Sequence, residues 1–161
     1  MRVLITGGAG YIGSHTVLAL IEAGHEPVIL DNFSNSSPEA IRRVGELAGR
    51  EIEFVEGDLL DVELVERVFA EGNFDAVIHF AGLKAVGEST AQPLRYYRTN
   101  IVSTLNLLDA MDTHGVRTLV FSSSATVYGT SGATRCVEDL PLGTTNPYGA
   151  TKLHIEQILD D

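Results

Sequence analysis

Short apolar runs alternate with longer amphipathic segments along the whole chain. The apolar runs predict strands at Val3–Thr6, Pro27–Leu30, Ile52–Glu56, Ala76–Phe80 and Thr118–Ser122. The amphipathic segments have a helical period and predict helices at Ile12–Glu22, Pro38–Ala48, Val62–Phe69, Pro93–Met111 and Pro147–Leu159. Regular alternation of this kind is typical of right-handed βαβ units around a parallel sheet. The sequence therefore predicts an α/β fold, a doubly wound parallel sheet in three layers with its strands in the order 3-2-1-4-5.

The alternation stops where a sixth strand is due. The last predicted helix reaches Asp160 and Asp161 without a following strand, which leaves the fifth predicted strand as an apolar edge of the sheet. A chain of 161 residues fits one domain, and no repeat or linker divides it. We therefore expect residues 1–161 to form one incomplete domain, C-terminally truncated, at the front of a larger protein.

Composition and charge restrict the partners. The formal net charge of −11 disfavours nucleic acid, which requires a basic surface. No apolar stretch is long enough to span a bilayer, and the chain begins with a predicted strand rather than a signal peptide. Cys136 is the single cysteine, which favours a reducing cytoplasm, and the histidines lack metal-ligand spacing. We expect a cytoplasmic protein with no nucleic-acid, membrane or metal partner.

A glycine-rich loop joins the first predicted strand to the first predicted helix. It contains Gly8-x-Gly10-x-x-Gly13 and, in a second frame, Gly7-x-x-Gly10-x-x-Gly13. Such glycines make a tight turn, let a pyrophosphate approach the backbone and let the helix pack on the strand, while amides at the helix start face the phosphates. Asp31, closing the next strand, would accept hydrogen bonds from the adenosine ribose and repel a 2′-phosphate. The pattern predicts a Rossmann-like site for NAD, and the alternative is a purely structural turn.

Tyr148 and Lys152 lie four positions apart in the last predicted helix, so they share one of its faces. An adjacent ammonium and the positive nicotinamide ring favour the phenolate, so Tyr148 could remove a hydroxyl proton while hydride leaves for the cofactor. Ser122, Ser123 and Ser124 follow the fifth predicted strand, and we expect one of their hydroxyls to hydrogen-bond the reacting oxygen. An ordinary surface helix and a capped turn are the alternatives.

Longer motifs connect the chain to one group of enzymes. They are Gly7–His15, Leu30–Asn32, His79–Ser89, Ser122–Gly129 and Pro147–Gly149. With these motifs in order along its whole length, the chain resembles the UDP-glucose 4-epimerases, which are extended short-chain dehydrogenase/reductases. The segment His79–Ser89 is the most diagnostic, because the wider superfamily shares the glycine loop and the Tyr/Lys pair but not this string.

The resemblance implies a role for each matching position. Tyr148 would be the base, Ser124 its hydrogen-bonding partner, and Lys152 would anchor the nicotinamide ribose and tune Tyr148. Substrate contacts are implied for Lys84, Ser124 and Tyr148. Cofactor contacts are implied for Gly7, Gly10, Tyr11, Ile12, Gly13, Asp31, Asn32, Asn35, Ser36, Asp58, Leu59, Phe80, Ala81, Lys84, Asn100, Tyr148 and Lys152. Strand-end packing by Phe80 and Ala81, and a helix cap or bend at Asn100, are the alternatives.

The implied activity is NAD-dependent interconversion of UDP-galactose and UDP-glucose by transient oxidation at sugar carbon 4, a step of galactose metabolism. Ala125 and Thr126 stand where dehydratases and decarboxylases of the superfamily carry an acidic residue, so elimination is disfavoured. A homodimer through the helices Pro93–Met111 and Pro147–Leu159 is also implied. Because relatives take most uracil, phosphate and sugar contacts from a C-terminal half, we expect the chain alone to be inactive. A non-catalytic NAD-binding fragment, and another nucleotide-sugar epimerase or oxidoreductase, remain alternatives.

Overall fold

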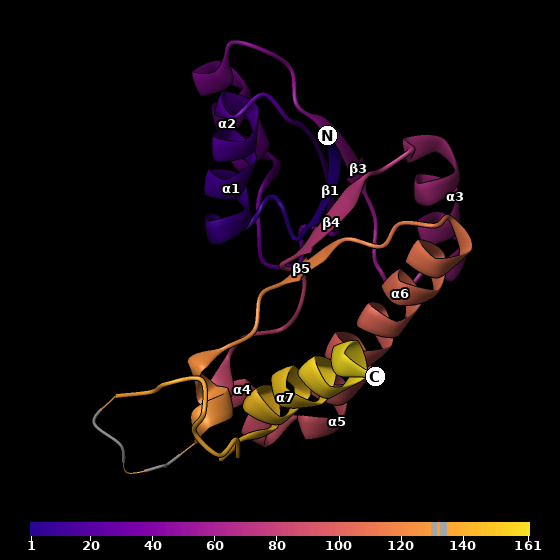
Figure 1. Cartoon of the computed structure of the whole chain (residues 1–161). Coiled ribbons are helices and arrows are strands. Elements are labelled where there is room, and N and C mark those ends of the chain that lie inside the picture. Colours follow the sequence, from indigo (N-terminus) through magenta and orange to yellow (C-terminus); the bar gives the residue numbers. More distant parts are fainter. Residues whose placement is uncertain (130–131, 133–134) are drawn as a thin grey trace. The chain divides into compact units, whose positions relative to one another are not determined.

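Parallel strands form a single five-stranded sheet (Figure 1). The structure, a computed structural model, describes residues 1–129, 132 and 135–161. It divides into a first unit, Met1–Ala81 with Asn106–Ser122, and a second unit, Gly82–Leu105 with Ser123–Asp161. The sheet belongs to the first unit and consists of β1 (Arg2–Thr6), β2 (Glu26–Asp31), β3 (Glu53–Glu56), β4 (Ala76–His79) and β5 (Leu119–Phe121). Its order is β3-β2-β1-β4-β5, so the parallel sheet and the strand order expected from the sequence are confirmed.

The register aligns the carboxyl ends of the central strands. Thr6 of β1 pairs with Leu30 of β2 on one side and with His79 of β4 on the other. The loops that follow these three strands therefore leave the sheet at the same edge, which is where ligands bind in folds of this class.

Helices cover both faces of this sheet (Figure 1). Ile5 of β1 is buried in a cluster with Val17 of α1, whereas its neighbour Leu4 is buried in a second cluster with Phe69 of α3 and Leu107 of α6. Successive strand residues point to opposite faces, so the two clusters are the two interfaces of a three-layer fold, as expected. The helices concerned are α1 (Tyr11–Glu22) and α2 (Pro38–Ala48) on one face, and α3 (Val62–Gly72) and the part of α6 (Ser103–Thr113) in the first unit on the other.

Local capping fixes several helix ends. Pro38 is the first residue of α2, and the Ser37 hydroxyl before it accepts a hydrogen bond from the Glu39 amide at 3.3 Å. Helix α3 extends to Gly72, three residues beyond its expected end at Phe69, and stops at Asn73, which has φ +47°. Asparagine tolerates this left-handed conformation, so it ends a helix much as glycine does.

The second unit contains helices α4 (Val86–Ala91), α5 (Pro93–Tyr97) and α7 (Pro147–Asp160), a π-helical turn (Arg98–Val102) and a 3-10 turn (Ala125–Tyr128). The helix expected over Pro93–Met111 is confirmed as one helical run, in which a π-helical turn that the sequence did not predict separates α5 from α6. Neither α4 nor the 3-10 turn was expected, because both are short and rich in Ser, Thr or Gly, so they carry no apolar period. Helices α4 and α5 both pack against α7.

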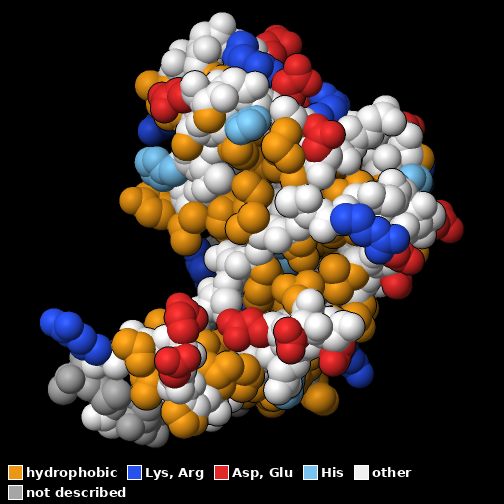
Figure 2. Space-filling view, viewed as in Figure 1, with side chains coloured by type: hydrophobic (Ala, Val, Ile, Leu, Met, Phe, Trp, Pro, Cys, Tyr) orange, Lys and Arg blue, Asp and Glu red, His pale blue; other side chains and the backbone are white. Residues whose placement is uncertain are grey.

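In the part of the chain that the structure describes, no helix is both long and apolar enough to cross a bilayer. On the face drawn in Figure 2, the described Lys and Arg side chains are scattered rather than gathered into one patch. This distribution agrees with the acidic net charge of −11.

Candidate functional site

The glycine-rich loop lies at the carboxyl end of β1 in the first unit. Gly7 has φ +70°, and its amide donates to the Leu30 carbonyl at 2.8 Å. A Cβ added at Gly7 would lie 2.7 Å from the Ala81 amide nitrogen, and one at Gly13 would lie 2.4 Å from the Gly7 carbonyl oxygen. Residue 7 therefore needs glycine for its left-handed backbone, and residue 13 needs it so that α1 can approach the loop.

The amino end of α1 is open to a ligand. Gly10 is the N-cap and provides no side-chain hydrogen bond, and the first turn contains no acidic residue. The amides of Tyr11, Ile12 and Gly13 have no acceptor within the helix, and the side chains of Tyr11 and Ile12 are 78% and 60% exposed. Uncapped amides at the positive end of a helix dipole bind anions such as phosphate, so this end fits a pyrophosphate.

Asp31 connects the glycine loop to the loop that follows β2. Its carboxylate is buried and accepts hydrogen bonds from the Ala9 amide at 3.0 Å, the Phe33 amide at 3.0 Å and the Ser36 hydroxyl at 2.7 Å. A carboxylate accepts about four hydrogen bonds, so one position remains for a ligand hydroxyl. The sequence identified Asp31 and Ser36 but missed the Ala9 amide, because a backbone donor leaves no trace in residue type.

A second polar pair lies on the loops after β2 and β3. The Asn32 amide group donates to the Asp58 carboxylate at 2.8 Å, and the other carboxylate oxygen of Asp58 accepts from the Leu60 amide at 2.9 Å. Leu59 is buried, and its carbonyl accepts from the Asn106 side chain at 2.9 Å. The structure thus brings Asn32 and Asp58 together, two residues that the sequence motifs predict to be cofactor contacts. Asn35 is exposed, and within the described ranges it makes no hydrogen bond to this group.

Phe80 and Ala81 follow β4 and lie beside the glycine loop. The Phe80 amide donates to the Thr6 carbonyl at 3.0 Å, and Ala81 is the residue that a Cβ on Gly7 would strike. The Thr6 hydroxyl lies 2.6 Å from Nδ1 of the buried His79 and accepts from the Ala81 amide at 3.4 Å. Buried Thr6 and His79 therefore fix the turn that carries Phe80 and Ala81, a role that their residue types did not indicate.

The second unit holds the remaining predicted residues, Lys84, Asn100, Ser124, Tyr148 and Lys152. Helix α7 starts at Pro147, where the Asn146 side chain caps it by accepting from the Gly149 amide at 2.8 Å. Tyr148 is half-buried in the first turn, and Lys152, one turn later, is 5% exposed. Burial lowers the pKa of the Lys152 amine to about 8, because desolvation disfavours its charged form.

Ser124 lies on a turn that contacts the start of α7. Its hydroxyl oxygen accepts from the Thr126 amide at 3.2 Å and from the Thr126 hydroxyl at 2.9 Å. A Cβ on Gly149 would lie 3.0 Å from the Thr126 hydroxyl oxygen, so the Ser124 turn and the Tyr148 turn are in close contact. Ser123 instead donates its hydroxyl to the Glu156 carboxylate. Since a hydroxyl has one proton, Ser124 can act as acceptor here and still donate to a third group.

Asn100 holds together three segments of the second unit. Its buried side chain accepts from the Leu83 amide at 2.8 Å and donates to the Leu83 carbonyl and the Thr151 hydroxyl, each at 3.0 Å. Thr151 in turn donates to the Tyr148 carbonyl at 2.7 Å. Asn100 also lies in the π-helical turn, a local departure from α-helical geometry. The sequence did not predict this role of Thr151, because a threonine in a helix does not by itself indicate which groups its hydroxyl will bond.

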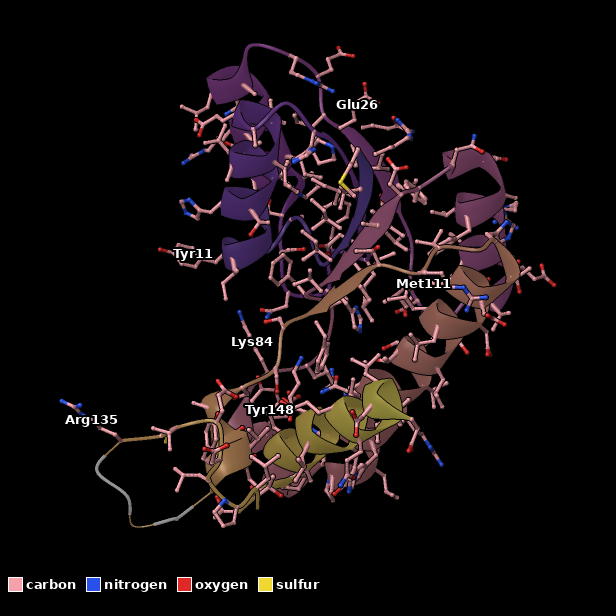
Figure 3. The ribbon with its side chains drawn as sticks, in the orientation of Figure 1. Tyr11, Glu26, Lys84, Met111, Arg135 and Tyr148 are labelled. Carbon is pink, nitrogen blue, oxygen red and sulfur yellow. The ribbon has the colours of Figure 1, made fainter. Side chains whose placement is uncertain are left out.

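Lys84 lies in the loop after β4, in the second unit. Its side chain is exposed and, among the residues that the structure describes, it forms no ion pair. Figure 3 shows Lys84 on the same side of the second unit as Tyr148. No group of three or more His, Cys, Asp or Glu side chains that could hold a metal occurs within the described residues.

Comparison with known proteins gives a family and a set of relatives. A family model described as GDP-mannose 4,6 dehydratase matches residues 4–161. The chain is 60% identical to UDP-glucose 4-epimerase of Bacillus subtilis, over 100% of its own length and 48% of that protein. Among solved structures, the UDP-glucose 4-epimerase of Bifidobacterium longum with NAD+ and UDP has a TM-score of 0.98 at 53% identity, covering 100% of this chain and 48% of that chain. The epimerase of Stenotrophomonas maltophila with NAD and formylated UDP-arabinopyranose has a TM-score of 0.97 at 46% identity, with the same coverages.

These findings confirm the resemblance to UDP-glucose 4-epimerases that the sequence motifs indicated. The chain spans about half the length of the relatives it matches, at 48% coverage. The family model, by contrast, covers nearly all of the chain. On this evidence, together with the doubly wound sheet and its glycine loop, the chain belongs to the GDP-mannose 4,6 dehydratase family.

Proposed function

We propose that this chain is the NAD-binding and catalytic part of a UDP-glucose 4-epimerase, which interconverts UDP-galactose and UDP-glucose at sugar carbon 4. The observation that carries the proposal is the Tyr148–Lys152 pair on α7, with a buried amine one turn from a phenol and the Ser124 turn packed against the same helix. It is supported by relatives named as UDP-glucose 4-epimerases, one of which matches the chain over its whole length at 60% identity.

The first unit fits a dinucleotide. The uncapped start of α1, with Gly7, Gly10 and Gly13, would take the pyrophosphate through the amides of Tyr11 and Ile12. The remaining acceptor position of Asp31 would take a ribose hydroxyl, and its negative charge would repel the 2′-phosphate of NADP. The other proposed contacts are Asn32, Asn35, Ser36, Asp58, Leu59, Phe80 and Ala81 in this unit, and Lys84, Asn100, Tyr148 and Lys152 in the second.

Bound NAD would supply reversible hydride transfer at sugar carbon 4. The protein's part is proton transfer and orientation. Tyr148 would remove the proton of the 4-hydroxyl at its phenolic oxygen, and Ser124 would donate a hydrogen bond to the reacting oxygen. With a pKa of about 8, Lys152 is mostly protonated at neutral pH, and its positive charge would stabilise the negative charge that develops on the reacting oxygens during proton transfer. Lys84 would bind the diphosphate of a UDP-sugar or of NAD.

The test of this proposal is Tyr148→Phe in the complete gene product. Loss of the proton acceptor is expected to lower turnover of UDP-galactose by at least about a hundredfold, the smaller end of the range for a general base. NAD affinity, measured by calorimetry, should change by no more than about twofold, because the ring remains. Tyr97→Phe, which removes the hydroxyl of a tyrosine on α5, is the matched control and should keep full turnover. Retained turnover in Tyr148→Phe would refute the assigned base.

A non-catalytic NAD-binding module is the second candidate, because the chain spans 48% of the epimerases it matches. A third is another nucleotide-sugar reaction, since the matching family model is described as a dehydratase. Elimination requires an acid near the reacting sugar, and the positions after Ser124 are Ala125 and Thr126, neither of which has a carboxyl group. Turnover assays of the complete gene product with UDP-galactose, UDP-N-acetylglucosamine and GDP-mannose separate these candidates.

We further propose a cytoplasmic homodimer that associates through α5, α6 and α7. Leu94, Val102 and Leu105 are exposed apolar residues along the run from α5 into α6, and burial in an interface would remove them from water. Cys136 is exposed and forms no disulfide, which suits a reducing compartment. Light scattering of the complete gene product tests the oligomeric state, and a monomer at micromolar concentration would contradict the dimer.

A further inference from the structure

The short segment Gly82–Ala85 carries Lys84, and side chains from one helical run bind its backbone on both sides of that lysine. Before Lys84, the Asn100 side chain accepts from the Leu83 amide at 2.8 Å and donates to the Leu83 carbonyl at 3.0 Å. After Lys84, the Tyr96 hydroxyl accepts from the Ala85 amide at 3.0 Å. Tyr96 and Asn100 are four positions apart, about one helical turn, so both reach the same segment.

Tyr96 reaches this segment through its hydroxyl. Its side chain is fully buried, and its hydroxyl donates to the Glu88 carboxylate at 2.8 Å while it accepts from Ala85. Burial, and then the hydrogen bond to Glu88, raise the pKa of Tyr96, so the phenol stays protonated and remains a donor. Glu88 is fixed in turn by an ion pair with Arg95.

Lys84 itself is exposed and lies between two residues whose backbone groups are hydrogen-bonded, Leu83 and Ala85. Among the described residues its ammonium group has no carboxylate partner, so its charge is available to an anion. A lysine side chain loses considerable rotamer entropy when it binds a ligand. If its backbone segment is already ordered, binding does not cost backbone entropy in addition.

We propose that Tyr96 is a positioning residue for diphosphate binding: with Asn100, it clamps the backbone around Lys84 so that the ammonium group is presented to the diphosphate of NAD or of a UDP-sugar. The inference rests on the proposed function, which assigns Lys84 to such a ligand. Tyr96 touches neither ligand, and its effect passes entirely through Lys84.

A double-mutant cycle of Tyr96→Phe and Lys84→Met in the complete gene product tests the clamp. Tyr96→Phe is expected to weaken binding of the diphosphate ligand about fivefold to tenfold, which is what loss of one hydrogen bond is worth. The Michaelis constant should rise by a similar factor, whereas kcat should change by less than twofold. In the Lys84→Met background the same change should weaken binding by less than twofold, because the group it positions is gone. Titrations with NAD and with UDP, run separately, show which diphosphate Lys84 serves.

Two further measurements keep the outcome decisive. Hydrogen exchange at the Ala85 amide should accelerate in Tyr96→Phe, while the Leu83 amide, still held by Asn100, stays protected. If Tyr96→Phe does not fold, Glu88→Ala removes the acceptor of the Tyr96 hydroxyl and should give a smaller loss of affinity, about twofold. Tyr97→Phe, whose ring stacks on His154, is the control and should leave affinity unchanged.

The clamp would be overturned if Tyr96→Phe lowered affinity equally in the wild-type and Lys84→Met backgrounds. Tyr96 would then stabilise the fold in general and would not act through Lys84. A wild-type protein that binds NAD and UDP but gives such additive losses leaves the proposed function intact. A wild-type protein that binds neither contradicts the proposed function, and the exchange rate of the Ala85 amide still decides whether Tyr96 holds the segment.

Discussion

Lys152 is a buried amine in the second unit. Burial lowers the pKa of its amine from 10.5 to about 8, so the folded protein disfavours the charged form that the unfolded chain keeps. The buried charge of Lys152 therefore lowers the free energy of unfolding at neutral pH. The proposed chemistry uses the same positive charge, which lies one turn from Tyr148. A residue that lowers stability and assists chemistry is typical of an active site.

Lys152→Met should raise the free energy of unfolding at pH 7 by up to about 3 kcal/mol, because Met fills the same space without a charge. Between about pH 8 and pH 10.5 the unfolded chain binds more protons at this residue than the folded protein does, so wild-type stability rises with pH relative to the variant. Urea denaturation at pH 7 and pH 10 measures the difference, which should shrink at the higher pH. The exposed Lys84→Met is the control, and an advantage of Lys152→Met that is independent of pH would contradict this reading.

A hydrogen bond within α7 and one from another element together hold the Tyr148 end of this helix. Thr151 donates to the Tyr148 carbonyl and accepts from Asn100, so a side chain of the π-helical turn holds the first turns of α7. The helix predicted from its period over Pro147–Leu159 is confirmed as α7, which has Pro147 as its first residue. The sequence could not predict the link to Asn100, which lies 51 positions away along the chain.

Thr151→Val keeps the shape of the side chain and removes its hydroxyl, which leaves one N–H of buried Asn100 without an acceptor. We expect a loss of about 1–3 kcal/mol in the free energy of unfolding, the range for an unsatisfied buried group. Turnover should fall as well, since the Tyr148 turn loses its anchor. The matched control is Thr113→Val on α6, an exposed threonine with the same type of bond to its own helix, to the Asp109 carbonyl at 2.9 Å, and it should change stability by less than about 0.5 kcal/mol. Equal losses in the two variants would exclude a role for the Asn100 contact.

At the scale of the whole molecule, the chain spans about half the length of the epimerases it matches, at 48% coverage. In epimerase catalysis, binding energy from the nucleotide, far from the reacting carbon, orients the sugar. The proposed pyrophosphate and ribose contacts of NAD, the glycine loop and the buried Asp31, lie in the first unit, and the proposed base Tyr148 lies in the second.

The 161-residue chain is therefore expected to bind NAD and to give no measurable interconversion of UDP-galactose and UDP-glucose. Calorimetry with NAD, and a coupled assay for UDP-glucose on the same preparation, test the two statements together. The complete gene product, assayed in parallel, provides the positive control for the reaction. Turnover by the 161-residue chain would show that it needs no further substrate-binding residues.

Patterns in the amino-acid sequence were enough to predict the order of the elements, the parallel sheet and the position of the glycine loop. These features depend on residues close together in the sequence. Examples are the spacing of apolar residues, the cap that Ser37 provides for α2, and the positive φ that glycine permits at residue 7. Other contacts became visible only in the folded structure. They are the hydrogen bonds of the Ala9 amide to Asp31, of Asn100 to Leu83 and Thr151, and of the Ala85 amide to the Tyr96 hydroxyl. These contacts join backbone groups and small polar side chains distant in sequence, and a buried polar group takes whichever partner the packed elements bring within reach.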